Sequence, residues 1–110
     1  MKHEFGIMQE DPSDKERFDT YEPQKYNCIE VNDDIIEPIL MDLQEVNCYW
    51  HTLQIEKGGL AYYGITLIPP KSMDVFINIL SLQKKEDYIS LILLANQAKK
   101  HGKYIIHFGI

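Results

Sequence analysis

Residues 60–80 read LAYYGITLIPPKSMDVFINIL, and within this stretch the side-chain pattern changes from that of a strand to that of a helix. The aromatic and β-branched residues of 60–68 predict a strand, which the two prolines after it bring to an end. Ser72 is a candidate N-cap for the next element. Four apolar residues then share one face at helical spacing: Met73, Phe76, Ile77 and Leu80. The stretch therefore predicts a fold that combines a sheet with helices.

Towards the C-terminus the sequence predicts a second helix and a last strand. Within 88–100, four apolar residues form a stripe: Tyr88, Leu91, Ile92 and Ala95. Three basic or titratable residues occupy the last turn: Lys99, Lys100 and His101. Gly102 is in the position of a C′ glycine, and residues 104–110 then predict a strand.

Towards the N-terminus the sequence predicts three more strands and one helix. Residues 48–55 are expected to form a hairpin with 60–68 through a turn at 56–59. An amphipathic helix of about three turns precedes this hairpin, with N-cap candidates at 32–34. The two remaining strands are predicted at 26–32 and 4–9.

This order of elements predicts an α+β fold and a single domain over residues 1–110. It matches the ferredoxin-like, split βαβ arrangement: an antiparallel or mixed sheet of about four to five strands, with about three helices on one face. An extra N-terminal strand would extend one edge. The side chains expected to be most buried are Ile39, Leu43, Ile65, Leu67, Phe76, Leu80, Ile92 and Ile106.

Composition excludes several classes of protein. Apolar residues make up 45% of the 110 residues and charged residues 25%, which excludes a disordered chain or a coiled coil. The net charge of −6 argues against nucleic-acid binding, which needs clustered Lys and Arg. No apolar run is long enough for a signal peptide or a membrane span, so we expect a cytoplasmic protein with no membrane partner. Frequent Ile and Lys with few Ala and Arg point to an A/T-rich bacterial gene, and Cys28 and Cys48 are expected to be reduced.

Charge is distributed unevenly along the chain. Residues 1–56 hold 14 acidic and 4 basic side chains, a net −10, whereas residues 57–110 hold a net +4. Residues 10–25 form a long acidic loop, with no helical stripe and two prolines. Such a loop is either merely solvated or a docking strip for a basic protein. The expected partner-binding residues are Glu16, Phe18, Asp19, Tyr21 and Glu22.

An aromatic hairpin is the other candidate site. Tyr49 and His51 alternate onto one face of their predicted strand, and Tyr63 on the paired strand would complete a pocket. A histidine with tyrosine hydroxyls is suited to acid–base work near neutral pH, although cross-strand packing alone would also explain the cluster. The spacing of the four histidines predicts no metal site, and no motif indicates a cofactor or names catalytic residues.

Two functions stay open at this point, beside simple homodimerisation with a structural or regulatory role. The first is a protein-interaction module that binds and neutralises a basic partner, as immunity proteins and antitoxins do. The second is a small-ligand-binding α+β protein or small enzyme that uses Tyr49, His51 and Tyr63. The second requires a homodimer that packs two exposed apolar sheet faces together. The absence of a catalytic motif favours the non-enzymatic function.

Overall fold

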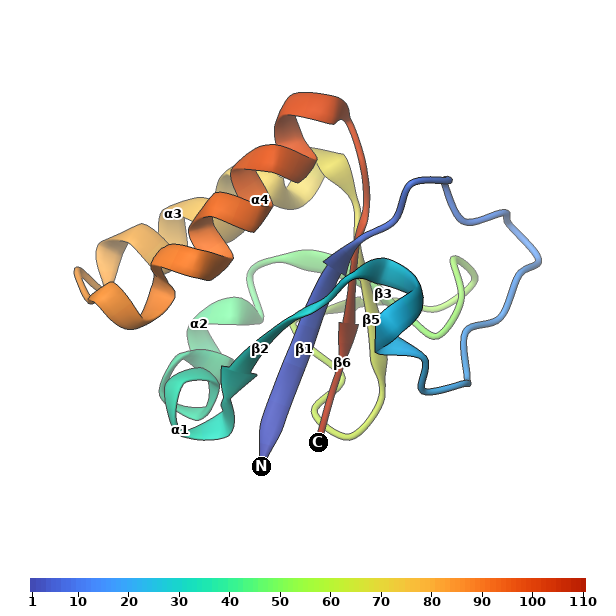
Figure 1. The fold of residues 1–110 in the computed structure, drawn as a ribbon. Helices are drawn as coiled ribbons and strands as arrows, with labels where there is room; N and C mark the ends of the chain where they lie inside the picture. The colour runs from blue at the N-terminus through green and yellow to red at the C-terminus, as the bar shows by residue number, and fades with distance from the viewer.

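The computed structural model describes residues 1–110 as a six-stranded antiparallel sheet with helices against one face (Figure 1). The strands lie in the order β2–β1–β6–β5–β3–β4. Their bounds are β1 Lys2–Ile7, β2 Ile29–Asn32, β3 Asn47–Trp50, β4 Glu56–Gly58, β5 Ile65–Ile68 and β6 Ile105–Phe108. A long loop between β1 and β2 runs on the side of the sheet away from the helices (Figure 1).

The helices form three units. The first is α1 (Asp33–Ile36), a 3-10 turn (Glu37–Ile39) and α2 (Leu40–Leu43), and it connects β2 to β3. Pro38 interrupts this unit, since proline has no N–H to donate to the helical ladder. Asn32 caps α1, and its side-chain oxygen accepts the Asp34 N–H at 2.8 Å. The other two units are α3 (Met73–Leu82) and α4 (Ile89–His101).

The α+β class is confirmed, but the ferredoxin-like topology is not. Between β5 and β6 the chain makes a hairpin of two helices, α3 and α4, so it returns to the end of the sheet where β5 stopped (Figure 1). β6 therefore pairs antiparallel with β5, with Thr66 opposite His107. β1 lies inside the sheet between β2 and β6 instead of extending an edge, and the sheet has six strands rather than the four to five predicted.

The predicted hairpin of 48–55 with 60–68 is also corrected. β3 ends at Trp50 because His51 takes a left-handed conformation with φ of 64°. The chain turns at 51–54 and returns as β4, which pairs with one edge of β3, while β5 pairs with the other edge. Gly58 is therefore a strand residue, packed so closely on the Gln44 carbonyl that a Cβ would collide with it.

Apolar side chains form a core on each face of the sheet. Between sheet and helices, 18 buried residues form one cluster, which includes Phe5, Ile68, Phe76 and Leu91. On the opposite face a cluster of five is formed by Met8, Ile65, Leu67, Ile106 and Phe108. Of the predicted core residues only Ile92 is wrong: it is half-buried, because the inward stripe of α4 is Leu91, Ala95 and Ala98.

The acidic loop covers the smaller cluster. Phe18 and Tyr26 are half-buried against it, so the apolar sheet face that a face-to-face dimer would need is already covered by the chain itself. The two cysteines lie on opposite faces of the sheet, Cys48 in the larger cluster and Cys28 beside the smaller one. Burial raises the pKa of each thiol to about 12. None of the helices has both the length and the apolar character needed to cross a bilayer.

Candidate functional site

A cleft of about 510 Å³ lies where the acidic loop meets the connection between β4 and β5. Strands β1 and β6 contribute its floor through Glu4 and Phe108, and the start of β5 contributes Ile65. The residues around it include Glu4, Asp19, Tyr21, His51, Tyr63 and Phe108. The cleft therefore combines carboxylates with aromatic rings from five separate parts of the chain.

His51 fastens the acidic loop to the sheet. Its Nδ1 lies 2.9 Å from the Phe18 carbonyl oxygen and 3.0 Å from Asp19 Oδ1, and the Phe18 N–H donates to the His51 carbonyl at 2.7 Å. Its Nε2 accepts the Ile65 N–H at 3.4 Å. These partners assign the ring hydrogen to Nδ1. Because the chain itself occupies both ring nitrogens, His51 positions the loop and is not free to act as a base.

Two tyrosines flank the cleft. Tyr21 is 61% exposed, meets Phe108 edge-on at 5.6 Å between ring centroids, and donates its hydroxyl hydrogen to Glu4. That hydrogen bond raises the pKa of Tyr21. Tyr63 is 81% exposed and meets Tyr62 edge-on at 4.9 Å. Exposed aromatic rings beside carboxylates are suited to holding a cationic group.

The structure brings together parts of both predicted sites and separates others. His51 and Tyr63 line the cleft with Asp19 and Tyr21, so the predicted ligand site and the predicted docking strip share one surface. Tyr49 does not line the cleft, since it is half-buried against the smaller cluster. Among the other docking residues, Phe18 packs on the same cluster, while Glu16 and Glu22 lie in the loop before and after the cleft residues and do not line the cleft.

The loop neutralises part of its own charge. Arg17 Nε lies 2.8 Å from Asp19 Oδ2, and Lys25 Nζ lies 3.4 Å from Glu22 Oε2. Both pairs are largely exposed, so each contributes little to stability. Glu16 has no cationic partner within ion-pair distance and accepts only the Ser13 N–H, at 3.3 Å.

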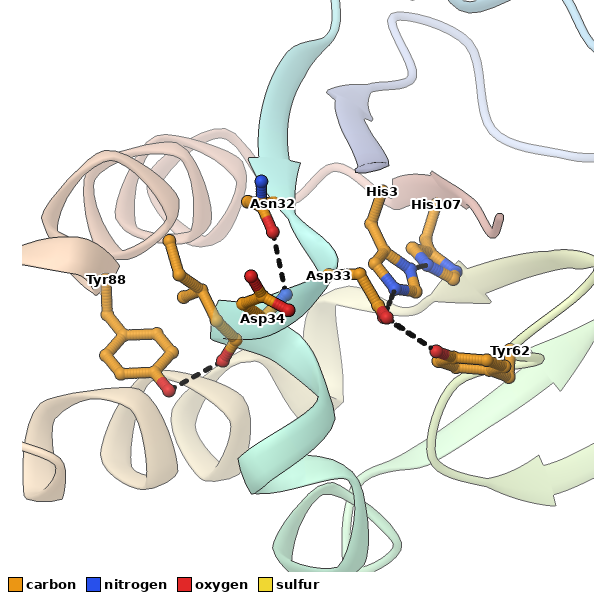
Figure 2. Close-up of polar contacts among 8 residues, drawn as sticks. His3, Asn32, Asp33, Asp34, Tyr62, Tyr88 and His107 are labelled. Atoms are coloured by element: carbon orange, nitrogen blue, oxygen red, sulfur yellow. Dashed lines mark hydrogen bonds and ion pairs between the residues drawn. The ribbon is translucent and has the colours of Figure 1, made fainter. Parts of the chain in front are cut away.

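A second cluster of polar groups is buried on the helix side of the sheet (Figure 2). Asp33 Oδ1 lies 2.8 Å from His3 Nε2, and His3 Nδ1 lies 2.9 Å from His107 Nε2. His107 Nδ1 continues the row to Thr66 Oγ1 at 3.1 Å. The Tyr62 hydroxyl donates to both oxygens of Asp33, at 2.8 and 2.7 Å. We call Asp33, His3, His107 and Thr66 the buried row.

Burial and hydrogen bonding set the charges of the buried row. Asp33 accepts hydrogen bonds from His3 and Tyr62, and these hold the pKa of its carboxyl group below the usual range. Burial, with the neighbouring His3, holds the pKa of His107 well below its usual value. The hydrogen bond to the Asp33 carboxylate raises the pKa of Tyr62 to about 12. At neutral pH, Asp33 is therefore the negatively charged member and His107 is neutral.

Sequence reasoning missed the buried row, although a signal for part of it was present. His3 and Phe5 share one face of β1, and His107 shares a face of β6 with Ile105, because strand side chains alternate. A histidine on a core face must find hydrogen-bond partners. Asp33 and Tyr62 carried no such signal, because only the fold brings α1 and the β4–β5 connection to these strands. The structure contains no group of three or more His, Cys, Asp or Glu side chains placed to hold a metal ion.

Comparisons with protein-family models, with curated proteins and with solved structures find no match to this chain.

Proposed function

We propose that this chain is a bacterial, cytoplasmic interaction module that binds a basic protein partner through the cleft and the acidic loop, as immunity proteins and antitoxins bind theirs. The observation that carries the proposal is the contact of His51 with Phe18 and Asp19. This contact holds an acidic segment next to Tyr63 at one concave surface. Acidic and aromatic groups are thereby arranged around the same space.

The chemistry of the cleft suits a lysine or arginine side chain of the partner. A cation between Tyr21 and Tyr63 would face two aromatic rings, each worth about 0.5–1 kcal/mol at an exposed site. Asp19 would supply a charge-assisted hydrogen bond after exchanging its contact with Arg17. The remaining acids of the loop would raise the rate of encounter, and salt would weaken that effect.

The aromatic anchors differ from each other in availability. Phe18 is committed to covering the smaller cluster, so its contribution to binding is indirect. Tyr21 and Tyr63 are mostly exposed and border the cleft. Because buried aromatics dominate the energy of interfaces, we expect these two tyrosines to contribute more than any single carboxylate.

Capture of partners from the source cytosol at low salt tests the proposal. One variant carries Glu16→Lys, Asp19→Lys and Glu22→Lys, and a matched control carries Asp42→Lys, Glu45→Lys and Glu86→Lys, three exposed acids of the helical layer. The proposal expects a basic protein that binds the wild type and the control and is lost from the loop variant. Tyr63→Ser, which leaves every core contact in place, should weaken the same interaction.

Equal capture by the loop variant and the wild type would overturn the proposal, and so would equal loss from both triple variants. If a protein is captured by the wild type and lost from the loop variant, it must be purified and shown to bind directly, since retention from a lysate alone does not establish a partner. Circular dichroism of each variant shows whether the fold is retained.

A small cationic ligand is the second candidate for the same cleft, because about 510 Å³ lies within the range of ligand pockets. In that case Tyr63 would contact the ligand, His51 would hold the loop that borders it, and Tyr49 would only support β3. Arginine amide at millimolar concentration should then raise the melting temperature of the wild type, and Tyr63→Ser should remove the increase. No increase in melting temperature would leave the protein partner as the occupant.

A further inference from the structure

The buried row has no part in the proposed binding surface, yet both of its ends contact residues that directly precede that surface in the chain. At one end the Ala61 N–H donates to Thr66 Oγ1 at 2.8 Å. At the other end the Tyr62 hydroxyl donates to Asp33. Ala61 and Tyr62 belong to the connection 61–64, and its next two residues, Tyr63 and Gly64, line the cleft. The row therefore crosses β5, β6 and β1 and ends at Asp33 of α1, and it holds the connection 61–64 at two points. Figure 2 shows the part of the row from His107 through His3 to Asp33 and Tyr62.

The hydrogen bonds of the row point in one direction when both histidines are neutral. Thr66 accepts from Ala61, so its own hydrogen is free for His107 Nδ1. His107 Nε2–H then donates to His3 Nδ1, and His3 Nε2–H donates to Asp33. Each donor has an acceptor, and no buried side-chain nitrogen or oxygen lacks a partner. Both rings therefore carry their hydrogen on Nε2.

One added proton fits the row only if this direction reverses. With the proton on His3, its Nδ1–H must donate to His107 Nε2, so the hydrogen of neutral His107 moves to Nδ1 and donates to Thr66. Thr66 Oγ1 then receives two donors, and its own hydrogen loses its acceptor. A second proton is excluded, because two N–H groups would face each other across 2.9 Å.

We propose that the buried row is a binding site for a single proton, and that loading it loosens the connection 61–64 and so alters the cleft. The cause lies at Thr66, where the oxygen that holds Ala61 is left with an unsatisfied hydroxyl hydrogen. The effect of the proton on binding rests on the proposed function of the cleft. The proton site itself is argued from the geometry of the row alone.

The surroundings of the row leave few other groups that could take up the proton. His107 packs against the Phe5 ring at 4.8 Å between ring centroids and otherwise meets His3 and Thr66. His3 faces Asp33 from α1 and the Tyr62 ring at 5.4 Å. Beyond these, the Met1 amino group acts on Asp33, and Glu37 and Tyr63 act on Tyr62. His3 is thus the only histidine of the row in direct contact with an anion.

Nitrogen-15 NMR of the histidine rings in the intact protein, between about pH 7.5 and 4.5, tests this site without any partner. We expect His3 to become charged while His107 stays neutral and moves its hydrogen from Nε2 to Nδ1 at the same midpoint. The backbone amides of Ala61, Tyr63 and Gly64 should shift with that midpoint too. Asp33→Asn should lower the midpoint by at least about one pH unit, because it removes the anion beside His3.

Asp34→Asn is the matched control: it removes an exposed charge one residue away and should leave the midpoint unchanged. If Asp33→Asn does not fold, Tyr62→Phe replaces it, and the loss of a donor to Asp33 should raise the midpoint. Any of four results would overturn the inference. His107 becomes charged, its tautomer stays fixed while His3 takes up the proton, the amides of residues 61–64 do not shift, or the protein unfolds before His3 is charged. These results do not depend on partner capture, so failure here is distinct from failure of the proposed function.

Discussion

The two faces of the sheet are built differently. The helix side buries 18 apolar residues from β strands, α1, α2, α3 and α4, so every element of that layer contributes to one core. The loop side buries five and completes its cover with half-buried rings, among them Phe18 of the acidic loop and Tyr26 directly after it. Regular elements supply the stability of the fold, whereas an irregular segment covers the other face and brings charges and aromatic rings to its surface.

The histidines follow the same division. His3 and His107 are fully buried between strands and helices, and only other side chains satisfy them. His51 lies on the loop side, partly exposed, and binds mainly backbone groups and Asp19. The hydrogen-bond partners of His3 and His107 are titratable or hydroxyl side chains, so these two rings are coupled to protonation. His51 instead holds the acidic loop against the sheet.

Core truncations should separate the two faces most strongly. Phe76→Ala on the helix side should lower the free energy of unfolding by about 3–5 kcal/mol, because it leaves a cavity under α3. Phe18→Ala should lower the free energy of unfolding by only about 1 kcal/mol, since the Phe18 ring is half-buried and its outer side is exposed to solvent. Urea unfolding measures both. Equal losses would show that the loop belongs to the core and is not a cover.

The pH dependence of stability should come from the helix side. Because the pKa of His107 is lowered on folding, the unfolded chain binds a proton that the native protein refuses. Stability should therefore fall as pH drops below about 6.5, with a slope of about 1.4 kcal/mol per pH unit. His107→Gln should flatten this slope, and the exposed His101→Gln should not. An unchanged slope in His107→Gln would place the titrating group elsewhere.

A substitution at the boundary of the two faces should have a smaller effect. A Cβ on Gly64 would lie 2.5 Å from His51 Nε2, so Gly64→Ala must displace a ring held by Phe18 and Asp19. We expect a loss of about 1–3 kcal/mol and faster hydrogen exchange at residues 13–20, where the loop is fastened. Unchanged exchange there would mean that His51 does not hold the loop.

The smallest effect on stability is expected at Arg17. Arg17→Gln removes an exposed ion pair and should change the free energy of unfolding by less than about 0.5 kcal/mol. It also frees a carboxylate oxygen of Asp19, so affinity for a basic probe should rise. A fall in affinity would mean that Asp19 must be held by Arg17 in order to bind.

Much of the helix side was predictable, because its elements follow regular periods. Spacing located α3 and α4 and most of their inward residues, although it placed Ile92 in the core in place of Ala98. It also located the Gly102 cap, which is left-handed with φ of 63°. The strand order was not predictable in the same way. It depends on pairing partners far apart in sequence, such as β1 with β6, which no local pattern specifies.

The cleft was predictable in its residues but not in its assembly. Asp19, Tyr21, His51 and Tyr63 were all candidates, yet in two separate sites. The left-handed turn at His51 joins them, and a non-glycine residue in that conformation leaves no clear mark in sequence. The same turn removed Tyr49 from the site, because β3 ends before the predicted alternation could continue.

Titration of the nitrogen-15-labelled protein with a hexa-arginine peptide at low salt tests the central claim most directly, because it maps where a basic group binds. We expect saturable amide shifts concentrated at Asp19, Tyr21, His51 and Tyr63, reduced in Tyr63→Ser and in high salt. Shifts of equal size at the exposed acids Asp42, Glu45 and Glu86 would contradict the claim, since they would show that the peptide follows negative charge wherever it occurs and that the cleft has no special role.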